Sequence, residues 1–223
     1  MSEIGFSLIS FSSCIIINHI LIKYNFLIDK KFFPHKSFVS ENSIPISGGL
    51  IFILNTLLFL RFENNFSYVL FLIFIVGVLS DLNILKSPYK RFILQITVIL
   101  FLSFLSKSFI SSIRIPLFDH LLTITLFKYF FVVFCLLILI NGSNFIDGVN
   151  TLLIGYYMSV VLIMIILINK YNFDLDTQNL KIIFFVLFVI FVFNFFEKLF
   201  CGDGGSYLIS LIVGYYLIEL SNL

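Results

Sequence analysis

The sequence predicts an all-α, polytopic membrane protein with about eight transmembrane helices. Hydrophobic residues make up 60% of the 223 residues and charged residues only 12%, and the mean hydropathy is +1.11. These values exclude an ordinary soluble domain. Apolar runs near the length that crosses a bilayer, about 17 to 25 residues, recur along the whole chain. Helices are expected because a spanning backbone must satisfy its own hydrogen bonds, and no alternating strands of about ten residues occur.

The expected spans follow these apolar runs in chain order. They cover residues 4–22, 47–60, 66–80, 91–109, 124–140, 151–168, 180–196 and 206–220. The second and third are short for a full crossing, so we expect them to be tilted, kinked or extended through their flanks. Glu3 stands where a signal peptide carries basic residues, so the first span is expected to remain attached. Because no linker or repeat divides the chain, residues 1–223 are expected to form one integral-membrane domain.

Counting spans places the polar connections at 23–46, 81–90, 141–150 and 194–205 on one face of the membrane. With the span ends included, this face carries eight Lys or Arg residues against six on the other. The positive-inside bias therefore favours it as the cytoplasmic face. The net charge of +2 is too small to predict a nucleic-acid partner.

Three of the polar segments each centre on one aspartate: SDLNILKSPYK on Asp81, NGSNFIDGVN on Asp147 and CGDGGS on Asp203. Their shared face would gather the three carboxylates, as a metal-dependent phosphate site requires. The glycine-rich GDGGS opens a helix, where N–H groups and the helix dipole favour anions. Asp81 has two interpretations, a helix cap or a carboxylate beside bound phosphate. Lys90 would supply a point charge to a phosphate oxygen.

The second of these segments also carries amides. Asn141, Asn144 and Asp147 recur at a spacing of three, which on a continuing helix places them on one face. Gly142 and Gly148 instead suggest a loop. Helix capping explains one such residue but not three within seven, so the segment predicts a functional site. Asn194, nine residues before Asp203, adds a polar group on the same face.

In this order the segments resemble the polyprenyl-phosphate N-acetylhexosamine-1-phosphate transferases, the MraY/WecA-like family also called glycosyltransferase family 4. The resemblance covers most of the chain and is carried by four ordered motifs. PISGG matches the family's Pro-x-x-Gly-Gly, and SDLNILKSPYK its carboxylate pair followed by Leu and a Lys five residues on. NGSNFIDG matches Asn-x-x-Asn-Phe-x-Asp-Gly, and FNFFEKLFCGDGGS matches Phe-Asn followed by Gly-Asp-x-Gly-Ser.

The resemblance implies transfer of a sugar 1-phosphate from a UDP-N-acetylhexosamine to polyprenyl (undecaprenyl) phosphate, with release of UMP and with Mg2+ as cofactor. It places this reaction at the cytoplasmic face of a bacterial inner membrane, at the start of a surface glycan such as O-antigen or capsule. A homodimer, the choice of sugar and the glycan pathway are left open.

The resemblance also implies a role for each matching residue. Asp203 would hold the metal, and Asp81 and Asp147 would position or deprotonate the lipid phosphate and orient the diphosphate. Lys90 would offset developing charge. The residues expected to hold nucleotide or diphosphate through neutral donors are Asn141, Asn144 and Asn194.

Two departures from the family pattern favour an alternative, a catalytically silent remnant or membrane subunit of the same fold. Ser80 stands where the family has the first carboxylate of the pair, and the family's histidine loop and last spans are not found before Leu223. A small transporter is the third hypothesis. It predicts charged residues near the middle of spans, and Lys128, the single candidate, lies near an outer span end.

Overall fold

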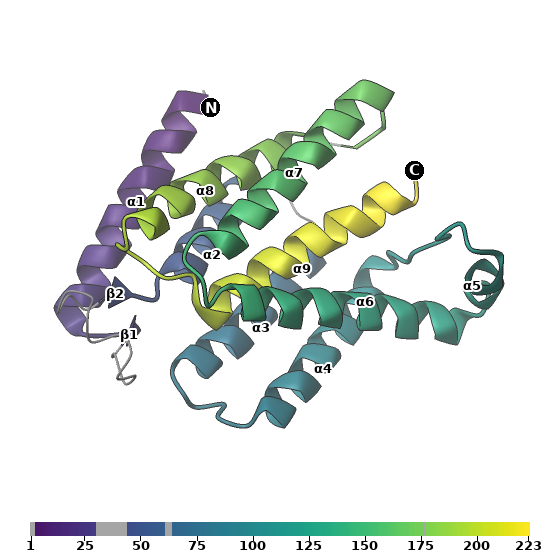
Figure 1. Ribbon diagram of the computed structural model, residues 1–223, viewed down its shortest axis with the longest axis horizontal. Helices are drawn as coiled ribbons and strands as arrows, with labels where there is room; N and C mark the ends of the chain where they lie inside the picture. The colour runs from purple at the N-terminus through teal and green to yellow at the C-terminus, as the bar shows by residue number, and fades with distance from the viewer. Residues whose placement is uncertain (1–2, 30–43, 61–63, 176) are drawn as a thin grey trace.

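The computed structural model describes residues 3–29, 44–60, 64–175 and 177–223. It consists almost wholly of α-helices, which confirms the predicted fold class (Figure 1). Two short strands, β1 (Ile28–Asp29) and β2 (Ile44–Pro45), pair antiparallel. The helices are α1 (Glu3–Tyr24), α2 (Gly48–Phe59), α3 (Asn64–Asp81), α4 (Pro88–Ser106), α5 (Pro116–Leu121), α6 (Thr125–Ile146), α7 (Leu152–Tyr171), α8 (Thr177–Phe195) and α9 (Gly202–Ser221).

Each expected span coincides with a helix, and the short α5 lies within an expected connection. Among the described residues, five helices are long and apolar enough to cross a membrane, namely α4, α6, α7, α8 and α9. The apolar stretches of α1, α2 and α3 are shorter. The chain is therefore a multi-pass membrane protein, and the number of eight crossings stays a prediction.

Two helix boundaries decide how the polar segments are presented. Helix α6 continues through Gly142 to Ile146, so Asn141 and Asn144 lie on a helix rather than in a loop. Asp147 follows as its C-cap, with its N–H bonded to the carbonyl oxygen of Ser143 at 3.1 Å. Helix α9 begins at Gly202, whose φ of +74° favours glycine, so GDGGS opens this helix as predicted.

Helix α9 forms the centre of the fold. Of its most apolar stretch 72% is buried, against 28–39% in the other four long helices. It contacts α2, α3, α6 and α7, and Figure 1 shows it in the middle of the bundle. A Cβ atom on Gly49 of α2 would lie 2.6 Å from the backbone nitrogen of Gly205, and one on Gly77 of α3 would clash with the backbone of Gly204. Glycine at these positions lets α2 and α3 lie directly against the first turn of α9.

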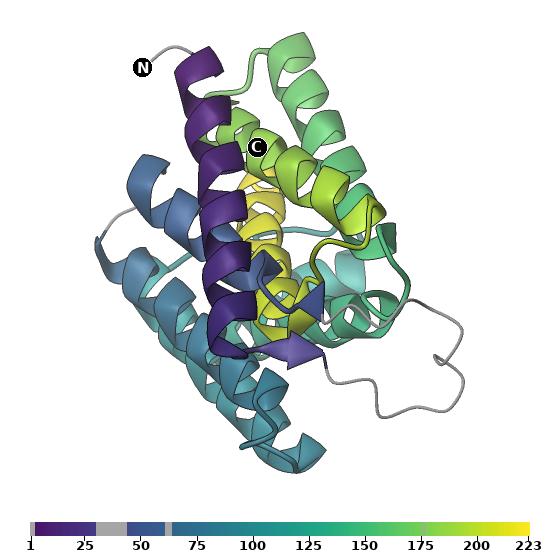
Figure 2. The ribbon, with the colours of Figure 1, turned by 90° about the vertical axis from the view of Figure 1, so that its left-hand side faces the viewer.

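The N-terminal part of the chain packs on the same end of α9. Helix α1 lies beside α2 and α8 (Figure 2), and its Asn18 Nδ2 donates to the carbonyl oxygen of Lys198 at 3.3 Å. Phe200 N–H donates to the carbonyl oxygen of Pro45 at 2.9 Å, and Gly48 N–H donates to that of Phe200 at 3.0 Å. These bonds hold the PISGG segment against the residues that lead into α9.

Candidate functional site

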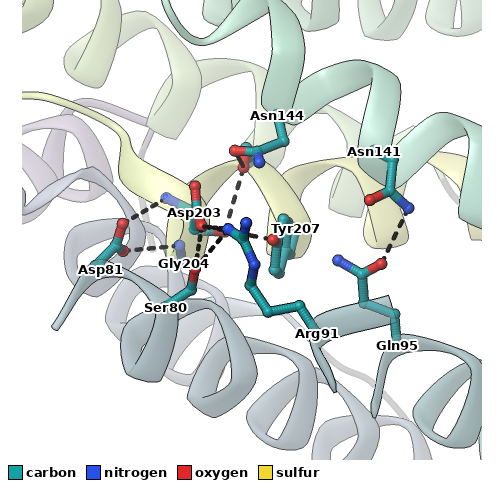
Figure 3. Close-up of polar contacts among 10 residues, drawn as sticks. Ser80, Asp81, Arg91, Gln95, Asn141, Asn144, Asp203, Gly204 and Tyr207 are labelled. Carbon is teal, nitrogen blue, oxygen red and sulfur yellow. Dashed lines mark hydrogen bonds and ion pairs between the residues drawn. The ribbon is translucent and has the colours of Figure 1, made fainter. Parts of the chain in front are cut away.

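Asp81, the last residue of α3, contacts the first turn of α9 (Figure 3). Its carboxylate accepts one hydrogen bond from the N–H of Asp203 at 2.8 Å and one from the N–H of Gly204 at 2.9 Å. A carboxylate there satisfies N–H groups that a helix start leaves without partners, and it complements the positive end of the helix dipole. Asp81 therefore caps α9, which agrees with the helix-cap interpretation of the sequence. The N–H groups of Asp203 and Gly204 already bond to Asp81 in this structure.

Asp203 is the centre of a polar network that joins α3, α4 and α9. Its Oδ2 accepts hydrogen bonds from Ser80 Oγ, from Arg91 Nη1 at 3.0 Å and from Tyr207 Oη at 3.5 Å. Arg91 Nη1 also donates to Ser80 Oγ at 2.9 Å. The side chains of Arg91 and Asp203 are only 26% and 20% exposed, so their ion pair is partly shielded from water. The network fixes the orientation of the Asp203 carboxylate (Figure 3).

Asp147 brings the third carboxyl group to this end of the bundle. Burial, with a smaller contribution from the neighbouring charge of Asp81, raises the pKa of Asp147 to about 7, although a hydrogen bond from the Gly202 N–H opposes the rise. A carboxyl group with such a pKa changes its protonation near neutral pH. It is therefore suited to accept or release a proton during a reaction.

The three predicted amides differ in their surroundings. Asn144 Oδ1 accepts a bond from Ser206 Oγ at 3.4 Å, at the edge of the aspartate cluster. Asn141 lies on α6 one helix turn before Asn144, and its Nδ2 donates to Oε1 of Gln95 on α4 at 3.0 Å. Asn194 is 4% exposed, and its amide bonds to the N–H of Thr151 at 2.6 Å and the carbonyl oxygen of Leu199 at 2.8 Å. In this structure Asn194 joins the start of α7 to the segment before α9, and its substrate-binding role stays a prediction.

The basic residue that reaches the cluster is Arg91 rather than its neighbour Lys90. The Lys90 side chain is exposed, whereas Arg91 bonds to both Ser80 and Asp203. Sequence reasoning missed Arg91, and it also missed Tyr207 and Gln95. Ser80 was recognised only as a departure from a family pattern, whereas here its hydroxyl group orients Asp203.

The donor atoms of the cluster fit a hard divalent cation bound together with a phosphate ligand. The described residues include no group of three or more His, Cys, Asp or Glu side chains arranged to hold a metal alone. Mg2+, however, usually takes one or two carboxylates and completes its coordination with water and substrate phosphates. Asp203 uses only Oδ2 in its side-chain hydrogen bonds, which leaves Oδ1 for a ligand. The Asp81 carboxylate lies near enough to Asp147 to raise the pKa of Asp147. A cation would offset this concentration of negative charge.

A family model described as glycosyl transferase family 4 matches residues 65–221. The matched region runs from the start of α3 to the end of α9 and includes all three clustered aspartates. A comparison with curated proteins found no significant match.

Proposed function

The chain belongs to glycosyl transferase family 4 and is a membrane sugar-phosphate transferase, and we propose that it transfers N-acetylhexosamine 1-phosphate from a UDP-sugar to polyprenyl phosphate. The observation that carries this proposal is the meeting of Asp81, Asp147 and Asp203 at one end of an apolar helical bundle. A lipid phosphate in the bilayer and a water-soluble nucleotide sugar can reach such a position from opposite sides.

The proposed reaction is a displacement at phosphorus. An oxygen of the polyprenyl phosphate attacks the phosphorus that carries the sugar, and a new P–O bond forms. The bond from that phosphorus to the bridging oxygen breaks, and UMP leaves with the electron pair. Phosphoryl transfer of this kind depends mostly on positioning and on stabilising negative charge.

The residues of the cluster support this chemistry in different ways. Asp147, with a pKa of about 7, would take the proton of a monoprotonated lipid phosphate, because the second pKa of a phosphate ester, about 6, lies slightly below that of Asp147. Arg91 would offset negative charge beside the transferred phosphate, with exposed Lys90 on the approach. Asn141 and Asn144 offer neutral amides to the nucleotide sugar. Asp81 supports the site by fixing the first turn of α9.

Asp203 is the residue that we propose to hold Mg2+, through the oxygen that its hydrogen bonds leave unused. When bound, Mg2+ neutralises charge on the diphosphate. Ser80, Arg91 and Tyr207 keep the Asp203 carboxylate in one orientation, which limits the entropy lost when the substrates bind.

We further propose that the aspartate end of the bundle faces the cytoplasm of a bacterium, where UDP-sugars are made, and that the product starts a surface glycan. The excess of Lys and Arg in the connections on this face supports the orientation, eight against six.

Release of UMP by the purified chain tests the proposal. The protein in detergent would be mixed with UDP-N-acetylglucosamine, polyprenyl phosphate and Mg2+, and then with other UDP-N-acetylhexosamines. We expect UMP release that requires both substrates and is lost in Asp203→Asn. Asp174→Asn serves as the matched control, because Asp174 is exposed in the connection between α7 and α8, away from the cluster. Equal UMP release by wild type and Asp203→Asn would remove Asp203 from the reaction.

A further inference from the structure

The connection between α6 and α7 begins with Asp147 and ends with a strained residue. It covers residues 147–151, and its last residue, Thr151, has a φ of +67° and a ψ of −17°. This left-handed conformation is unfavourable for a β-branched residue, because the Cβ atom crowds the neighbouring backbone. Strained conformations persist only where surrounding contacts hold them, and they are common at functional sites. The rest of the protein must therefore hold Thr151 in this conformation.

Asn194 of α8 provides this contact. Its Oδ1 accepts a hydrogen bond from the N–H of Thr151 at 2.6 Å, and its Nδ2 donates to the carbonyl oxygen of Leu199 at 2.8 Å. The N–H group can only donate and the carbonyl oxygen can only accept, so the two partners fix the orientation of the amide. Only 4% of Asn194 is exposed. Its amide is thus buried between the start of α7 and the segment before α9, and both ends of the amide bond within the protein.

The two segments that Asn194 joins also meet at the Asp147 carboxylate. One segment runs from Asp147 to Thr151, and the other runs from Leu199 to Gly202. The N–H of Gly202 donates to the carboxylate of Asp147. Asn194 therefore bonds to both segments that form the contact between Asp147 and Gly202. A shift of either segment would move the carboxylate relative to the first turn of α9.

A second buried hydrogen bond holds the other end of the connection. Tyr157 of α7 is 0% exposed, and its hydroxyl group bonds to Ser143 Oγ in the last turn of α6. Ser143 Oγ donates its own hydrogen to the carbonyl oxygen of Leu139, so Tyr157 must be the donor in this bond. The carbonyl oxygen of Ser143 in turn accepts the N–H of Asp147 at 3.1 Å. The Tyr157 hydroxyl group thus fixes the helix turn that ends at Asp147.

We propose that Asn194 and Tyr157 are positioning residues, which together hold the strained 147–151 connection so that the Asp147 carboxylate stays against the first turn of α9. The inference rests on the proposed function, in which Asp147 takes the proton of the lipid phosphate. It gives Asn194 a role through Asp147, whereas the sequence predicts that Asn194 binds substrate. A carboxylate held in this way needs little rearrangement when the substrates bind, which favours the reaction.

Asn194→Ala in the full chain separates positioning from substrate binding. We expect kcat for UMP release to fall by about 10- to 100-fold, because a displacement of about 1 Å can cost that much. Equilibrium binding of UDP-N-acetylglucosamine should stay unchanged. Loss of UDP-sugar binding at an unchanged unfolding temperature would overturn the inference, since it would show that Asn194 contacts the substrate.

Two further variants distinguish positioning from a general effect on stability. Thr151→Gly, added to Asn194→Ala, relieves the strain that Asn194 no longer holds, because glycine adopts the left-handed conformation readily. The double variant should recover unfolding temperature but not kcat, and recovery of both would overturn the inference. Tyr157→Phe should lower kcat by about 3- to 10-fold, the loss typical of one neutral hydrogen bond. Tyr156→Phe is its matched control, because Tyr156 is the adjacent residue and is exposed. Equal kcat values in the two tyrosine variants would exclude a positioning role for Tyr157.

Hydrogen exchange tests the hold on the connection without any turnover. The N–H of Thr151 bonds to a buried amide and should exchange slowly in wild type. In Asn194→Ala the amides of residues 147–152 should exchange about tenfold faster or more, while those of α4 stay unchanged. Unchanged exchange at residues 147–152 would overturn the inference. If wild type shows the slow exchange but releases no UMP from any UDP-N-acetylhexosamine, the proposed function fails and the positioning role fails with it, whereas the hold on the connection stands.

Discussion

Asp81→Asn separates the capping role of this residue from a catalytic one. In the structure its two oxygens accept separate hydrogen bonds from the N–H groups of Asp203 and Gly204. Asparagine keeps one acceptor and turns an NH2 group toward the other N–H. Burial raises the pKa of Asp81 to about 7, so the full effect is expected above that pH, where Asp81 is ionised. There the start of α9 loses one charge-assisted hydrogen bond, about 1.5–3 kcal/mol, and a negative charge at its positive end, about 0.3–1 kcal/mol.

The two losses together predict destabilisation of about 2–4 kcal/mol. For a chain of this length each kcal/mol lowers the unfolding temperature by about 2–4 °C, so we expect a decrease of about 5–15 °C. Thermal unfolding in detergent would measure it, with Asp174→Asn as the control. If Asp81→Asn abolishes UMP release while the unfolding temperature stays equal to that of wild type, the capping argument is wrong and the carboxylate acts on substrate.

Three further predictions concern the same end of the bundle. Arg91→Met should lower kcat/KM by about tenfold or more, since it removes a charge-assisted bond, whereas Lys90→Met should change kcat/KM less than about threefold. Steady-state kinetics of both variants measure this, and a larger loss in Lys90→Met than in Arg91→Met would contradict it. UMP release should increase as pH rises through about 7, because the raised pKa of Asp147 keeps it protonated below that value; a profile that is flat from pH 5.5 to 8.5, roughly spanning it, would exclude Asp147 as the base. Gly49→Ala should destabilise the protein by about 1–3 kcal/mol, because its Cβ would lie 2.6 Å from a backbone nitrogen of α9. Apart from its own helix backbone and chain neighbours, no atom of the described residues lies within 4 Å of a Cβ on Gly142, so Gly142→Ala should be neutral or stabilising. Similar unfolding temperatures for the two variants would contradict the packing argument.

The helices and the convergence of the polar segments could be predicted because both follow from the bilayer. Apolar length sets where helices run, and the even number of expected spans between Asp81, Asp147 and Asp203 predicts that they lie on one face. Glycine patterns were a weaker guide. Gly142 suggests a loop in sequence but lies inside α6, where its lost helix propensity is outweighed by the long apolar helix that precedes it.

The hydrogen-bond partners of the site could not be predicted, since they join helices that are distant in sequence. Asp81 caps α9 rather than its own helix, and Asn194 bonds to the N–H of Thr151 at the start of α7. Sequence rules for capping describe neighbours within a few residues. They do not indicate that a carboxylate at the end of one helix lies opposite the N–H groups of another.

Arg91 is a different case, because the periodicity of α4 does distinguish it from Lys90. Positions that share a face with Lys90, such as Leu94 and Thr97, are exposed, whereas Gln95 and Val98, on the face of Arg91, are buried. The amide of Gln95 one turn after Arg91 was the available signal, since a polar residue on the inner face of an apolar helix is seldom present without a partner or a function. The same face thus carries the cation that orients Asp203 and the amide donor that has no partner among the described residues. It is this side of α4, rather than the more conspicuous lysines of the preceding loop, that contacts the aspartate cluster.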